Sequence, residues 1–124
     1  MSFPRVYNPK LRGSRPKYGN KKTTVHGVTF DSKWESERYL YLKSLEAAGT
    51  IKNLELQPRF PIEVEGVKIC TYVGDFRYDR ELPTGDWENI VEDAKGVETP
   101  EFKIKKKLMK AVHDIDILLT KKRH

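Results

Sequence analysis

Two aspartates and a lysine are the residues of this 124-residue chain whose types and spacing could do chemistry. Asp75 lies in a strand-like run, VGDFRY, and Asp93 and Lys95 follow in VEDAKG. Alternate side chains of a strand share a face, so Asp93 and Lys95 should point one way while Glu92 and Ala94 point the other. If the two strands are hairpin neighbours, Asp75 lies beside Asp93.

Paired carboxylates of this kind predict a site for a hard divalent cation such as Mg²⁺. Two carboxylates a few ångströms apart repel each other, and a cation between them removes the repulsion. The metal would polarise a phosphate and lower the pKa of a bound water. Lys95 would orient that water or stabilise the charge that develops on the phosphate. The alternative is a surface ion pair, because Asp-x-Lys also occurs by chance in charged proteins.

The hydrophobic pattern predicts the elements that must position these residues. Asp31-Ser32 opens a helix that Gly49 ends, and Thr99 with Pro100 opens a second helix that runs to about His113. Strands are predicted at residues 25–30, 51–56, 60–64, 67–78, 87–95 and 115–119. The core order is α-β-β-β-α-β, which predicts a mixed α/β fold with a central sheet and one helix on each side or end.

Residues 1–24 are predicted to form a flexible basic arm before a domain at residues 25–124. The arm has three of the seven prolines and no acidic residue, whereas charges nearly balance in the rest of the chain. Such an arm favours a polyanion, because each neutralised phosphate releases condensed counterions. The alternative is a solvated tail that aids solubility. The expected DNA contacts of the arm are Arg5, Lys10, Arg12, Arg15, Lys17, Lys21 and Lys22.

Four separated strings resemble one known family. They are HGVTFDSKWESERYLYL (26–42), LQPRFPI (56–62), YVGDFRY (72–78) and VEDAKGVETPEFKIKKKLM (91–109). An acidic residue on a strand, followed by a hairpin and then Asp-x-Lys, is similar to the PD-(D/E)xK nuclease superfamily. More narrowly, the strings resemble small phage-encoded endonucleases of that superfamily, whose core fold is similar to that of Holliday-junction resolvases.

The resemblance implies a restriction-endonuclease-like core and Mg²⁺-dependent hydrolysis of DNA phosphodiester bonds, with Mn²⁺ able to substitute. Asp75 stands where the superfamily has its first metal-binding Asp. Asp93 and Lys95 match its (D/E)-x-K, and the backbone carbonyl of Ala94 is the usual additional metal ligand. Glu35 matches the acidic residue on the first core helix. The superfamily's proline before the first Asp is replaced here by glycine.

Three assignments keep an alternative. Glu35 is either a site residue or half of a capping box with Ser32, in which case Glu37 is the fallback. Glu92 competes with its neighbour as a metal ligand, although strand alternation favours Asp93. Gln57 either positions a water or phosphate or satisfies the backbone of its loop.

The second helix carries a stripe of lysines that is expected to contact the DNA backbone rather than only solvent. These are Lys103, Lys106 and Lys110. Trp34 and Trp87 are expected to pack in the core rather than to stack on bases.

The single cysteine, Cys70, excludes an internal disulfide and multi-cysteine zinc sites. No apolar run approaches the roughly 20 residues of a membrane span. We therefore expect a cytoplasmic protein, in the bacterial host if it is phage-encoded. Branched DNA is the expected substrate, because the chain has no room for a separate sequence-reading domain, and the resemblance to junction resolvases implies a role in DNA recombination. A homodimer is a further hypothesis. The rival hypotheses are a non-catalytic DNA-binding protein and a phage assembly adaptor on the same fold.

Overall fold

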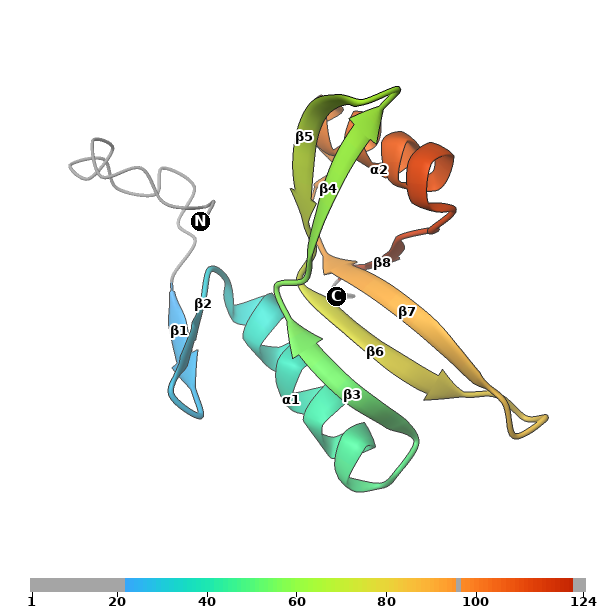
Figure 1. The fold of residues 1–124 in the computed structure, drawn as a ribbon. Helices are drawn as coiled ribbons and strands as arrows, with labels where there is room; N and C mark the ends of the chain where they lie inside the picture. Colours follow the sequence, from blue (N-terminus) through green and yellow to red (C-terminus); the bar gives the residue numbers. More distant parts are fainter. Residues whose placement is uncertain (1–21, 96, 122–124) are drawn as a thin grey trace.

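A four-stranded mixed sheet is the centre of the computed structural model, which describes residues 22–95 and 97–121. Its strand order is β3-β6-β7-β8 (Figure 1). β3 (Ile51–Leu56), β6 (Phe76–Glu81) and β7 (Trp87–Ala94) are antiparallel neighbours. β8 (Leu118–Thr120) runs parallel to β7. The predicted mixed α/β class with a central sheet is thus confirmed.

Both predicted helices form, and each begins at the residue whose side chain can cap it. α1 (Lys33–Ala47) begins after Ser32, whose Oγ accepts the Glu35 N–H at 3.1 Å. α2 (Pro100–His113) begins after Thr99, whose Oγ1 accepts the Phe102 N–H at 3.1 Å. A proline at the first position of α2 removes no helical hydrogen bond, because that N–H has no partner within the helix.

Two hairpins stand apart from the sheet, and they correct two of the predicted strands. The run at 25–30 is instead β1 (Thr23–Val25) and β2 (Val28–Phe30), so residues 23 and 24 belong to the folded part rather than to the arm. The run at 67–78 is not one strand but β5 (Val67–Val73), paired with β4 (Arg59–Val64), and then β6. The last strand is β8 and begins three residues later than predicted.

The break between β5 and β6 has a physical cause at residues 74 and 75. The Gly74 N–H donates to the Pro58 C=O at 3.0 Å, on the side of the β4–β5 hairpin. The next N–H, of Asp75, donates to the Glu92 C=O at 3.1 Å, in the four-stranded sheet. The chain therefore changes sheets between two consecutive residues, which the apolar pattern of the strands does not reveal.

The core consists of two apolar clusters, one on each face of the sheet. Side chains of β6 and β7 that share a face, such as Phe76, Tyr78 and Ile90, pack with Leu42 of α1. Val91, which points the other way, packs in a cluster with residues of α2 and the β4–β5 hairpin. One helix thus covers each face, as predicted. No helix among the described residues is long and apolar enough to cross a membrane.

Leu42→Ala should lower the free energy of unfolding by about 2–5 kcal/mol, because Leu42 is fully buried against the sheet. Leu40→Ala on the same helix is the matched control, since Leu40 is 43% exposed, and its effect should stay within about 1 kcal/mol. Urea denaturation of both variants measures the difference. Equal losses would contradict this account of how α1 packs.

Candidate active site

Asp75 is held at the point where the chain enters the central sheet. Its backbone N–H donates to Glu92, and its C=O accepts the Gln57 N–H at 2.9 Å. Its carboxylate Oδ2 accepts the Ala94 N–H at 2.8 Å. The N–H and C=O of a strand residue point to the same side, so the Ala94 carbonyl lies on the edge of β7 that faces Asp75. Three backbone contacts therefore fix this carboxylate beside the end of β7.

Asp93 is buried next to Asp75, and two side chains contact it. The Tyr72 hydroxyl donates to Asp93 Oδ2 at 2.5 Å, and Lys95 Nζ lies 3.6 Å from Oδ1. The Lys95 ammonium also lies 5.0 Å from the centre of the Phe102 ring. The Lys95 side chain is 35% exposed. The side chain of Lys95 is therefore accessible from solvent while it contacts a buried carboxylate.

The environment of Asp75 raises the pKa of its carboxyl group far above the usual value, so that the group stays protonated to higher pH. Burial, then the charges of Asp93 and Glu35, and then a hydrogen bond with Asp93 raise the pKa of Asp75 to about 9. The hydrogen bond from the Ala94 N–H acts in the opposite direction. Two acidic groups that share one site cannot both ionise at low cost. The three predicted carboxylates therefore interact at one place.

Glu35 satisfies part of both predictions made for it. Its backbone N–H caps α1 through Ser32, which is one half of the capping box. Its side chain is buried, and its charge raises the pKa of Asp75. The helix cap thus does not remove Glu35 from the acidic cluster. By contrast, Glu37 lies on the part-exposed side of α1, within 4.0 Å of Lys33.

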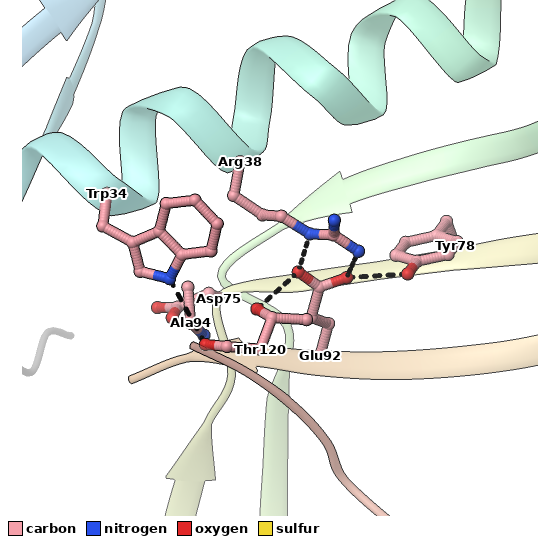
Figure 2. A network of polar contacts seen from close by, with 7 residues as sticks. All are labelled: Trp34, Arg38, Asp75, Tyr78, Glu92, Ala94 and Thr120. Carbon is pink, nitrogen blue, oxygen red and sulfur yellow. Dashed lines mark hydrogen bonds and ion pairs between the residues drawn. The ribbon is translucent and has the colours of Figure 1, made fainter. Parts of the chain in front are cut away.

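Glu92 has a different role from its neighbour, as strand alternation predicted. Its fully buried carboxylate accepts two hydrogen bonds from Arg38, one from the Tyr78 hydroxyl and one from the Thr120 hydroxyl (Figure 2). All of its strong acceptor positions are thereby used within the protein. Glu92 is a structural residue on the α1 face, while Asp93 and Lys95 lie on the opposite face.

Sequence reasoning missed the residues that support these two carboxylates. Tyr72 belongs to β5, which joins a different sheet, so its contact with Asp93 could not be read from spacing. Arg38 was recognisable in part, because it follows Trp34 by four residues and therefore shares a face of α1 with it. The position of Glu92 in a mostly apolar strand was the signal for its role, because a carboxylate buried there needs a cationic partner.

The remaining predicted contacts are dispersed. Gln57 adopts a left-handed backbone with φ of 52°, and its main-chain N–H donates to the Asp75 C=O, a contact that does not involve the side chain for which the two roles were predicted. Lys103 is exposed on α2, whereas Lys110 is ion-paired with Asp114 and Asp116. Of the arm, Arg5, Lys10, Arg12, Arg15, Lys17 and Lys21 lie outside the described residues.

The tryptophans depart from the predicted core positions. Trp87 is 39% exposed at the start of β7, and Lys52 Nζ lies 4.1 Å from the centre of its ring. Trp34 is partly buried, and its indole N–H donates to the Thr120 C=O at 3.3 Å. The prediction was wrong for Trp87, because the first residue of this strand extends beyond the cover of either helix.

The donor chemistry of the cluster suits a hard cation, since carboxylate and carbonyl oxygens are the ligands that Mg²⁺ prefers. In residues 22–95 and 97–121, however, no three His, Cys, Asp or Glu side chains are arranged to hold a metal ion. The described geometry therefore brings Asp75 and Asp93 together with Lys95, and it does not present a preassembled metal cage.

Fold and site together define a mixed α/β protein with a buried acidic pair and a lysine at one end of its central sheet. The chain belongs to the family described as "Protein of unknown function (DUF1064)", whose model matches residues 15–121. No curated protein and no solved structure matches the chain.

Removing the partner of Glu92 should be costly. Arg38→Met leaves a fully buried carboxylate without its cation, so we expect a loss of about 3–5 kcal/mol in the free energy of unfolding. Arg80→Met is the matched control, because the Arg80–Glu88 pair is exposed and should contribute at most about 1 kcal/mol. Similar losses in both variants, measured by urea denaturation, would refute the role given to Glu92.

The raised pKa of Asp75 predicts how stability depends on pH without divalent cations. Because the folded state favours the protonated acid, its contribution is complete below about pH 4 and is lost as the pH rises toward 9. In EDTA, the wild type should therefore lose stability relative to Asp75→Asn between pH 5 and 8, by at most about 1.4 kcal/mol per pH unit.

Asp79→Asn is the control for this comparison. Asp79 is exposed, and hydrogen bonds from Asn53 and Asn89 lower its pKa. Its contribution is lost only in acid, so the difference between wild type and Asp79→Asn should stay constant between pH 5 and 8. A constant difference for Asp75→Asn as well would contradict the raised pKa.

Proposed function

We propose that this protein is a metal-dependent DNA endonuclease whose active site contains Asp75, Asp93, Lys95 and Glu35. One observation carries the proposal. Burial, together with the nearby charge of Asp93, raises the pKa of Asp75 to about 9, and the part-exposed Lys95 ammonium lies 3.6 Å from the Asp93 carboxylate. A purely structural ion pair would need one carboxylate and one lysine, not an excess of acid. Such excess charge is typical of a site that binds a cation.

The arrangement of elements supports a restriction-endonuclease-like core within the mixed α/β class. Asp75 precedes β6, and Asp93 and Lys95 end the antiparallel neighbour β7. α1 carries Glu35 to the same end of the sheet. This is the order that the resemblance to the PD-(D/E)xK superfamily implies.

Asp75, Asp93 and the Ala94 carbonyl would hold Mg²⁺ or Mn²⁺, with Glu35 beside them. When bound, the cation supplies positive charge to the scissile phosphate and lowers the pKa of an attacking water. The Tyr72 hydroxyl fixes the orientation of Asp93.

Lys95 would stabilise the negative charge that develops on the phosphate, because its ammonium group lies at the mouth of the site.

Basic side chains outside the cluster would hold the DNA backbone. On α2 these are Lys103 and Lys106, with Lys110 partly neutralised by its ion pairs. The basic residues of the arm, including Lys22, would add contacts that depend on salt but not on sequence. A homodimer would place two such sites for symmetric cuts in branched DNA.

The deciding experiment is cleavage of a labelled four-way junction, a nicked duplex, a linear duplex and single-stranded DNA, each with Mg²⁺, Mn²⁺ or EDTA. We expect metal-dependent cutting that Asp75→Asn and Lys95→Gln each reduce by at least about 100-fold, the size of effect known for single electrostatic groups in active sites. Mg²⁺ should also raise the Tm of the wild type and not that of Asp75→Asn.

Asp79→Asn and Lys43→Gln are the controls, since both remove an exposed charge outside the cluster. They should keep cleavage within a few-fold of the wild type. DNA that is bound but never cut, with no effect of Mg²⁺ on Tm, would reject the endonuclease and favour a non-catalytic DNA-binding protein. Light scattering with and without the junction tests the homodimer.

A further inference from the structure

A pocket of about 420 Å³ lies between α1 and β8, outside the acidic cluster. Trp34 and Arg38 line it from α1, and Leu119, Thr120 and Lys121 line it from the last strand and the residue after it. Its volume is within the range of about 300–1,000 Å³ that is common for small-molecule sites. None of the functions assigned above uses this pocket.

One backbone carbonyl connects the pocket to the proposed catalytic lysine. The Thr120 C=O accepts the indole N–H of Trp34 at 3.3 Å and also the backbone N–H of Lys95 at 3.1 Å. Figure 2 shows Trp34 and Arg38 projecting from α1 toward Thr120 and Glu92. Trp34 also directly precedes Glu35, whose charge acts on Asp75, so the pocket adjoins the end of the sheet at which the acidic cluster lies.

The lining of the pocket combines an aromatic ring, an apolar side chain and two cations. The Trp34 ring is fixed by its hydrogen bond, and Arg38 is fixed by its two bonds to Glu92. The Lys121 side chain is 53% exposed, and its Nζ lies 3.5 Å from Glu98. An aromatic face suits a nucleobase, and lysine and arginine suit the phosphate attached to it.

We propose that the pocket takes one unpaired nucleotide of a DNA strand, with its base against Trp34 and its phosphate toward Lys121. This inference rests on the proposed endonuclease and defines its substrate class. A base inside a duplex is stacked on its neighbours, and removing it costs a few kcal/mol. A pocket that adjoins the acidic cluster would therefore favour DNA with an unpaired nucleotide near the cut, as in a junction, flap or single strand, over a continuous duplex.

Binding in EDTA tests the pocket without requiring cleavage. The chain has two tryptophans, so Trp87→Phe leaves Trp34 as the only one. A short thymidine oligonucleotide should quench the fluorescence of this variant. The same sugar–phosphate chain without bases has equal charge and should not quench it. Quenching by both chains, or by neither, would overturn the proposal.

Substitution of the ring should lower affinity in proportion to the lost stacking. Trp34→Leu should weaken binding of the thymidine oligonucleotide by about 5- to 150-fold, because base–aromatic stacking contributes about 1–3 kcal/mol. Trp87→Leu is the matched control and should change binding less than two-fold, on the order expected for a residue outside the site. Unchanged binding by Trp34→Leu would refute the pocket.

Two further variants separate stacking and phosphate contact from folding. Trp34→Phe keeps an aromatic ring and should retain most of the affinity even if Trp34→Leu is unstable. Lys121→Gln should reduce the slope of log affinity against log salt by about one, as expected for one lost phosphate contact. An unchanged slope would remove Lys121 from the proposal.

The outcome is distinguishable from that of the proposed function. Quenching of Trp34 without any metal-dependent cleavage would keep the nucleotide pocket and reject the endonuclease. Cleavage that Asp75→Asn abolishes, combined with normal binding by Trp34→Leu, would keep the endonuclease and reject the pocket.

Discussion

The buried carboxylate of Glu92 is the constraint on which the rest of this structure depends. A charge without access to water is tolerated only when a counter-charge and hydrogen bonds replace its hydration. Arg38, Tyr78 and Thr120 supply them from α1, β6 and β8. A single side chain of β7 thereby joins the first helix, a neighbouring strand and the last strand. The short parallel strand β8 is held in place beside β7 in this way, although it has only three residues.

The same side chain fixes which way β7 faces. Because the Glu92 side chain points toward α1, strand alternation places the side chains of Asp93 and Lys95 on the opposite face of the sheet. Asp93 lies there next to Asp75. Two adjacent acidic residues thus have opposite electrostatic conditions. Glu92 is paired with an arginine, while Asp93 lies between the carboxyl group of Asp75 and the ammonium group of Lys95. The folded protein thus favours the protonated form of Asp75, which costs stability at neutral pH, a cost that a functional site can justify.

The path of the chain at Gly74 explains how Asp75 reaches that position. A Cβ at residue 74 would lie about 3.4 Å from Tyr72 and Val91 side-chain atoms, so there is little free space there. The Gly74 N–H also donates to the Pro58 C=O. A proline at position 74 has no N–H and could not make this bond. A glycine at residue 74 therefore suits the switch between sheets.

The sequence by itself determined the helices, the alternation of β7 and the types of residue that could do chemistry. These are local properties: caps, apolar periods and the two-residue repeat of a strand act within a few positions. It did not reveal the break between β5 and β6, the contact of Tyr72 with Asp93, or the pocket at Trp34. Each of these depends on which strands pair, and pairing is decided by hydrogen bonds and burial between segments far apart in the chain. The expected approach of Asp75 to Asp93 depended on β6 pairing with β7, and Trp87 is exposed because neither helix covers the start of β7, so the tertiary structure decided both outcomes.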